Sequence, residues 1–184
     1  TWKIAGIRPL MQDNPISMNR SSGGGVGTRK KESRLPVEEA SSRLYLTDGK
    51  PYHPAISFWR CLFVACPNRT LGGKAAAGVV AAAVSHVEDE FWLLDPDTMK
   101  PLKQDAWKVD SRRAVNKKVG GIIICRPIWK KWAGLLTLEI DRDFLPTLDG
   151  LTELLNIAGR YGVGTGRMRR ADGKSEWGGL GLGK

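Results

Sequence analysis

Residues 160–170 combine the residue types that bind phosphate groups. Glycines at alternate positions leave backbone N–H groups accessible, because no side chain keeps a phosphate away from them. The flanking arginines are always charged and can bind a phosphate through two donors. Tyr161 adds an aromatic ring on which a base or a ribose can stack. The segment predicts a phosphate-binding loop, with a flexible turn as the alternative, and the expected contacts are Arg160, Tyr161, Gly162, Gly164, Gly166, Arg167, Arg169 and Arg170.

A second group of cations lies between residues 108 and 132, where eight basic residues accompany a single acidic one. The whole chain has 29 Lys and Arg against 19 Asp and Glu, a formal charge of +10. A third basic run follows the glycines at 23–27. One such run is usually a solvated face, but three clusters on an otherwise neutral chain indicate a polyanionic partner. In the second group we expect phosphate contacts from Arg112, Arg113, Lys117, Lys118, Arg126, Lys130 and Lys131.

The tryptophans allow two interpretations. Trp129 and Trp132 are three residues apart among lysines, so they either stack bases or belong to the core. Trp59 and Trp92 lie in apolar segments, and we expect both in the core.

Named nucleotide-binding motifs do not fit the chain. Residues 172–175 end like a P-loop, but Met168 occupies the position of its first glycine. The glycines at 162–166 lack the Rossmann spacing and follow a predicted helix instead of a strand. We therefore expect no cofactor and no ATPase or dehydrogenase activity.

Acid–base catalysis near neutral pH has two candidates, His53 and His86. His53 precedes a predicted helix and is the candidate for an RNA endonuclease, although a turn residue is the more frequent role for such a histidine. The paired carboxylates at 95–97 and 141–143 are typical of strand-end turns. We expect no catalytic residue and no metal site.

Length and composition predict one folded domain over residues 1–184. Hydrophobic residues make up 41% of the chain and charged residues 26%. No apolar stretch reaches the length of a membrane span, and no secretion signal is visible at the first residues. Cys61, Cys66 and Cys125 are odd in number and lie in apolar surroundings, as expected of buried thiols in a reducing compartment. These features predict a cytoplasmic protein without membrane contact.

The order of elements predicts an α+β fold. We expect a strand over residues 2–7, a long mobile loop over 11–43 and a helix over 54–66 that begins at Pro54. Residues 75–87 are compatible with helix or strand. A strand at 91–94 and a long ribbon over 107–141 follow.

The last predicted elements complete the pattern. A helix begins at Pro146 and carries leucines on one face, and a short strand follows Trp177. The pattern is typical of a ferredoxin-like or RRM-like βαββαβ fold with an antiparallel sheet, a basic β-ribbon and a C-terminal glycine-rich loop.

The chain resembles the RAMP superfamily, the repeat-associated RNA-binding proteins that include backbone subunits of CRISPR effector complexes. Residues 49–57 (GKPYHPAIS) are similar to that family's entry into its first helix, and residues 159–164 (GRYGVG) to its glycine-rich loop. The basic stretch 108–132 lies where such proteins carry a hairpin thumb. Residues 126–132 (RPIWKKW) also resemble short phage and mobile-element proteins. The resemblance implies a ferredoxin-like fold that holds single-stranded RNA or DNA.

We therefore expect a non-catalytic protein that binds single-stranded nucleic acid, RNA more than DNA, through phosphate contacts. The resemblance adds the expectation of a homo-oligomer or filament of repeated subunits along the strand. The alternatives are an RNA endonuclease that uses a histidine and a phage-type inhibitor that binds an acidic protein.

Overall fold

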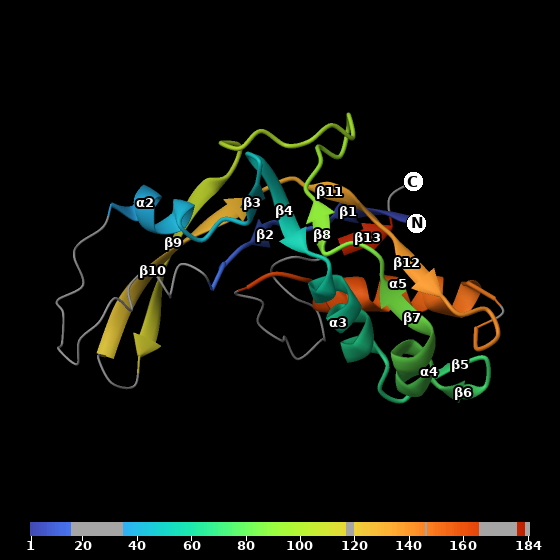
Figure 1. Cartoon of the computed structure of the whole chain (residues 1–184). Helices are drawn as coiled ribbons and strands as arrows, with labels where there is room; N and C mark the ends of the chain where they lie inside the picture. The colour runs from blue at the N-terminus through green and yellow to red at the C-terminus, as the bar shows by residue number, and fades with distance from the viewer. Residues whose placement is uncertain (16–34, 117–119, 146, 166–179, 183–184) are drawn as a thin grey trace, which may run out of the picture.

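The computed structural model describes residues 1–15, 35–116, 120–145, 147–165 and 180–182. The fold is mixed α+β, and its paired strands are antiparallel (Figure 1). The helices of the main body lie on one side of its strands, and a two-stranded ribbon extends away from it. None of the described helices is long and apolar enough to cross a membrane.

The first strand is the centre of the main sheet. β1 (Trp2–Gly6) pairs with β11 (Ala133–Leu136) on one edge and with β13 (Leu180–Leu182) on the other. Ile4 is fully buried, as the alternation of a half-buried strand requires. The two ends of the described chain therefore meet in one sheet.

A second set of strands continues this sheet. β3 (Leu46–Thr47), β4 (Lys50–Pro54) and β8 (Glu90–Trp92) pair in that order. Directly after β8, Leu94 forms a bridge with Ala133 of β11 through two N–H···O bonds of 2.8 Å. The neighbours across the body are therefore β3, β4, β8, β11, β1 and β13.

The ribbon consists of β9 (Lys108–Asn116) and β10 (Gly120–Trp129), in register from Lys108 opposite Ile128. β2 (Leu10–Met11) pairs with the last residues of β10, at the base of the ribbon. The short helix α2 (Pro36–Ser41) packs beside the same strands (Figure 1).

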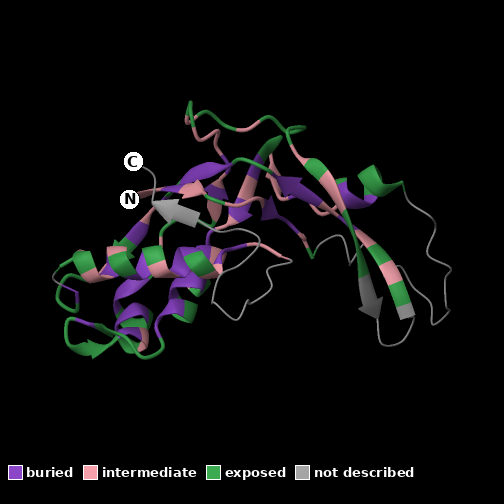
Figure 2. Cartoon of the chain, turned by 180° about the vertical axis from the view of Figure 1, so that it is seen from behind, coloured by how far each residue is buried: buried purple, intermediate pink, exposed green. Residues whose placement is uncertain are grey.

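Helices α3 (Ile56–Ala65) and α5 (Asp149–Tyr161) pack against each other beneath the sheet. α5 carries its leucines on the buried face, as the spacing predicted. Figure 2 shows the buried residues concentrated between these helices and the sheet.

The remaining elements extend the helical end of the body. α4 (Ala76–Ala83) leads directly into β7 (Val84–His86), which pairs with β12 (Leu138–Ile140). The hairpin of β5 (Thr70–Leu71) and β6 (Lys74–Ala75) connects α3 to α4.

Several predictions from the sequence need revision at their boundaries. β4 continues through Pro54, so the first long helix begins at Ile56. Segment 75–87, which was compatible with helix or strand, contains both. Its alanines form helix α4, and the backbone becomes extended at Val84. The expected loop over 11–43 was wrong at both ends, where Met11 is buried in β2 and α2 occupies 36–41, and its residues 16–34 lie outside the described part of the chain.

Trp129 and Trp132, for which the sequence allowed either base stacking or a place in the core, both belong to the core. Trp129 is 1% exposed and Trp132 is fully buried, so neither presents a ring for base stacking. The three cysteines are buried thiols that form no disulfide with one another, as expected.

Gly134 of β11 allows the sheet to close over the core. A Cβ at this position would lie 2.3 Å from Cζ of Phe91 and 2.7 Å from the carbonyl oxygen of Trp92. We predict that Gly134→Ala lowers the free energy of unfolding by about 2 kcal/mol, because the backbone oxygen cannot move away. Gly78, in α4, has nothing within 4 Å of its Cβ position. Gly78→Ala is the control and should stabilise by roughly 0.5 to 1 kcal/mol in urea unfolding.

Candidate nucleic-acid interface

The β9–β10 ribbon presents cations on both of its faces. Arg112 and Arg113 are both exposed, and as neighbours in β9 they point to opposite faces. Arg113 stands opposite Ile123, which is 66% exposed, and its guanidinium lies across Gly121. Exposed Lys108 begins the ribbon.

Carboxylates pair with two of the predicted phosphate ligands. Arg112 donates to Asp110 of the same strand, with Nε 2.7 Å from Oδ2 and Nη2 3.3 Å from Oδ1. Arg126 donates from Nε to Oδ2 of Asp13 over 2.8 Å, and its side chain is mostly buried. Arg126 therefore has a structural partner at the base of the ribbon.

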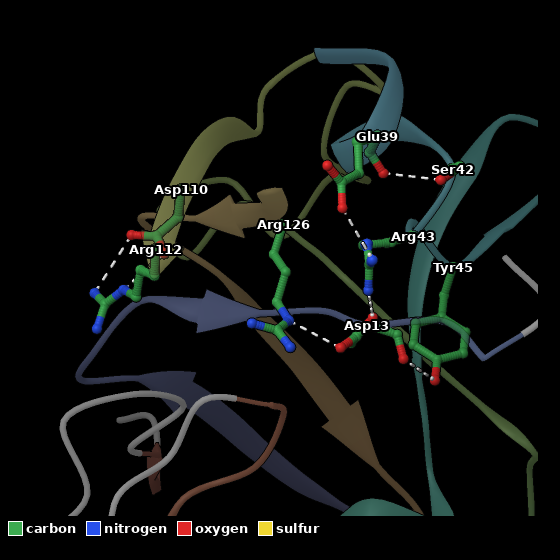
Figure 3. Close-up of polar contacts among 8 residues, drawn as sticks. All are labelled: Asp13, Glu39, Ser42, Arg43, Tyr45, Asp110, Arg112 and Arg126. Atoms are coloured by element: carbon green, nitrogen blue, oxygen red, sulfur yellow. Dashed lines mark hydrogen bonds and ion pairs between the residues drawn. The ribbon is translucent and has the colours of Figure 1, made fainter. Parts of the chain in front are cut away.

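Asp13 joins two arginines from different parts of the chain (Figure 3). Its other carboxylate oxygen accepts from Nη1 of Arg43, while Nη2 of the same arginine lies 3.2 Å from Glu39 of α2. Two carboxylates and two guanidinium groups thus form one mostly buried and neutral network. This network fixes α2 and the ribbon to the segment that follows β2.

Gln12, next to Asp13 in the chain, is fully buried and forms hydrogen bonds on the core side of this network. Its Oε1 accepts from Nε1 of Trp129 over 3.1 Å, and its Nε2 donates to the carbonyl oxygen of Tyr52 over 2.6 Å. Its backbone N–H donates to Pro127 over 3.1 Å. Residues 12 and 13 together connect β10, β4 and α2.

A pocket of about 290 Å³ opens beside this network, where the glycine-rich segment begins. Its lining comes from four separate parts of the chain and consists of Asp13, Tyr45, His53, Ser57, Arg60, Gly164 and Thr165. We call it the His53 pocket.

The start of the glycine-rich segment is held in place by the backbone. Gly162 and Gly164 both have positive φ, 73° and 85°, values that favour glycine. A Cβ at Gly164 would lie 2.6 Å from the carbonyl oxygen of Met11. That same oxygen accepts from the N–H of Thr165 over 2.9 Å. Gly164 therefore closes one wall of the His53 pocket.

Several residues that line the His53 pocket are of types that can bind phosphate or transfer protons. His53 is 4% exposed, and its ring packs edge-on against Tyr45 and Phe58. Ser57 lies in the first turn of α3, where the helix dipole favours an anion, and exposed Arg60 follows three residues later. Burial, with Tyr52 and Asp13 nearby, raises the pKa of Tyr45, which remains a hydrogen-bond donor at neutral pH.

Apart from Arg126 and Gly164, whose contacts are given above, the predicted site residues fall into three groups. Arg112, Arg113, Lys130 and Lys131 are exposed on the ribbon or just after it, and Arg160 is exposed at the end of α5. Tyr161 packs partly buried against the core, and Gly162 is buried. The predicted residues that lie outside the described part of the chain are Lys117, Lys118, Gly166, Arg167, Arg169 and Arg170.

The sequence contained a weak signal for the His53 pocket. His53, Ser57 and Arg60 are close in sequence, and the spacing of Ser57 and Arg60 puts them on one helix face. Tyr45 and Asp13 gave no signal, because the fold brings them there from distant segments.

Within the described residues, no group of three or more His, Cys, Asp or Glu side chains is arranged to hold a metal ion. Comparison with protein-family models, with curated proteins and with solved structures finds no match for this chain.

The Asp13 network gives a stability prediction. Asp13→Asn leaves Arg43 and Arg126 without their shared charge in a mostly buried place, so we expect a loss of about 2 kcal/mol of unfolding free energy. Asp110→Asn removes a carboxylate whose partner Arg112 is 44% exposed, and it should cost at most about 1 kcal/mol. Equal losses in guanidinium unfolding would contradict the structural role of Asp13.

Proposed function

We propose that this protein binds single-stranded nucleic acid, RNA more than DNA, through phosphate contacts made by the ribbon and by the start of the glycine-rich segment. The observation that carries the proposal is the β9–β10 ribbon, which extends from the body with exposed Arg113 along its length (Figure 1). Exposed Lys108, Lys130 and Lys131 lie at its base. Cations on an extended two-stranded element can follow a flexible backbone. The His53 pocket adds Arg60 and the first turn of α3 as anion-favouring groups.

We also propose a ferredoxin-like arrangement of the body, with the RAMP proteins as its relatives. A βαββαβ sheet has its fourth strand beside the first and its third between the first and the second. The pairing of β13, β1 and β11, with Leu94 next to Ala133, supports this order. The packing of α3 against α5 supports the two helices of that arrangement. A repeated subunit along the strand remains part of the proposal.

The salt dependence of binding tests the electrostatic part. Each phosphate contact to a single strand contributes about −0.7 to the slope of log K against log salt. Arg113→Ala and Lys130→Ala should each reduce the steepness of this slope by about 0.7 for a 20-nucleotide RNA in fluorescence anisotropy. Lys74→Ala removes an exposed charge at the hairpin beyond α3 and should leave the slope unchanged. A slope near zero for the wild type would refute phosphate-mediated binding.

A second candidate function is RNA cleavage, because His53 faces a pocket that also contains Arg60 and Tyr45. In such a reaction a base removes the 2′-OH proton, the 2′ oxygen attacks phosphorus, and the 5′ oxygen leaves with a proton. The phosphate then closes into a 2′,3′-cyclic ester on the upstream fragment. Arg60 would stabilise the charge that develops on phosphorus-bound oxygens.

Cleavage and binding are separated by incubating end-labelled RNA with the protein. The binding proposal expects intact RNA with wild type and with His53→Gln. The nuclease candidate expects wild type to produce a cyclic phosphate end that His53→Gln abolishes, while a strand with a single 2′-deoxy position stays uncut there. Cleavage that persists equally in His53→Gln would remove this residue from the reaction.

A further inference from the structure

A second hollow, of about 600 Å³, lies over β4, β8 and β11. Its apolar lining includes Trp92, Leu94, Met99 and Leu135. We call it the Trp92 pocket. Among the described residues no side chain lines both this pocket and the His53 pocket.

The alternation of the strands separates the two pockets. In the register of β4 and β8, His53 stands opposite Phe91 and Tyr52 opposite Trp92. Phe91 and His53 both pack against Phe58 of α3, so they face the helices. Tyr52 and Trp92 therefore face the other side of the sheet, where their rings form an edge contact with centroids 6.0 Å apart.

An aromatic and apolar row crosses this outer side. The bridge between Leu94 and Ala133 puts Trp92 level with Leu135 of β11, and Leu135 is opposite Lys3 of β1. Leu135 is 49% exposed although its neighbours in β11 are buried. The row consists of one residue from each of the adjacent strands β4, β8, β11 and β1, in this order Tyr52, Trp92, Leu135 and Lys3.

The loop after β8 forms a fixed wall of the Trp92 pocket. The carboxylate of Asp95 accepts from the backbone N–H groups of Asp97 and Thr98 over 3.1 and 2.8 Å. The N–H of Met99 donates to the carbonyl oxygen of Asp95 over 2.8 Å. The backbone of Met99 has a φ of 55°, in the left-handed region, where a residue other than glycine is strained. The wall is therefore formed before any ligand arrives.

Charges around the hollow are mixed and include two lysines. Lys50 lies in the lining together with Glu88, and Lys3 continues the row. Hydrogen bonds from the backbone and hydroxyl groups of Thr98, with a smaller effect of the charge of Lys131, lower the pKa of Asp95. The same loop runs on into the ribbon at Lys108 (Figure 1). The chain segment that forms this wall therefore leads directly into the first strand of the ribbon.

We propose that the Trp92 pocket binds an unstacked base of the strand whose phosphates the ribbon holds. An aromatic ring in an apolar hollow with lysines around it matches a flat base that is joined to anionic phosphates. An apolar peptide segment would fill the hollow but would leave Lys3 and Lys50 without a role. This inference rests on the proposed nucleic-acid binding and specifies where a base of the strand binds.

The test compares two strands and two proteins. The strands are a 20-nucleotide oligouridylate and a ribose-phosphate strand of the same length without bases. Wild type should bind the oligouridylate more tightly, and Trp92→Leu should lose about 5- to 100-fold of that affinity, the range of base–aromatic stacking. On the strand without bases, wild type and Trp92→Leu should bind equally, and their salt slopes should match because no charge is changed.

Two further variants guard against a general loss of structure. Trp59→Leu removes a tryptophan on the helix side, where it stacks on Phe63, and should leave affinity for both strands unchanged. Met99→Gly relieves the positive φ and removes part of the wall, so it should fold at least as stably as wild type and still lose base-dependent affinity.

The outcomes distinguish the inference from the function on which it rests. Equal affinity of wild type for both strands, or unchanged affinity for oligouridylate in Trp92→Leu and Met99→Gly, overturns base binding in this pocket and leaves phosphate binding intact. Failure of wild type to bind either strand at low salt overturns both proposals.

Discussion

The buried hydrogen bonds of Gln12 and the ion pairs of Asp13 hold the two parts of the molecule together. Gln12 bonds to Trp129 of β10 and to Tyr52 of β4, while Asp13 bonds to Arg126 of β10 and to Arg43. An unsatisfied partner in such a place costs about 1–3 kcal/mol, so each connection favours this one arrangement. The ribbon emerges from the body in a fixed direction because its base is tied at two adjacent residues.

The same junction limits which arginines can bind phosphate. Arg126 belongs to a basic segment of the sequence, yet its guanidinium balances a carboxylate at the ribbon base. Arg113 and Lys130 are exposed, and the proposed phosphate contacts are assigned to them. A count of basic residues therefore overstates the number of phosphate contacts, and the effective charge of the interface is lower than the charge of the segment.

Local patterns predicted most elements of the fold. The leucine spacing of α5 and the two strands of the ribbon follow from side chains within a few residues, so they are visible in the sequence. The predicted extent of the ribbon, 107–141, was wrong, because β11 pairs with β1 and β12 with β7 in the body. The partners of Gln12 and Asp13 on β10 are 117 and 113 residues away, and no local rule connects them. Sequence reasoning consequently assigned residue 12 to a loop, although it is fully buried.

The candidate site was predictable to a similar extent. The glycines at 162 and 164 and His53 were recognisable by residue type, but Tyr45 and Asp13 reach the same pocket only through the fold. Trp92 was expected in the core because its segment is apolar. Its place on the outer side follows from the register with Tyr52, which depends on the pairing of two strands 40 residues apart in sequence.

The two pockets share strand β4, and this sharing constrains both. Successive residues of β4 and β8 face the helices and the outer side in turn, so any shift of β4 displaces His53 and Tyr52 together. The carbonyl oxygen of Tyr52 is held by the buried amide of Gln12, which fixes β4 relative to the ribbon base. A binding surface whose parts are fixed before contact loses less conformational entropy when a flexible strand arrives. In the proposed function, the Gln12 contacts therefore serve both the ribbon and the Trp92 pocket, because they join β4 to the base of the ribbon.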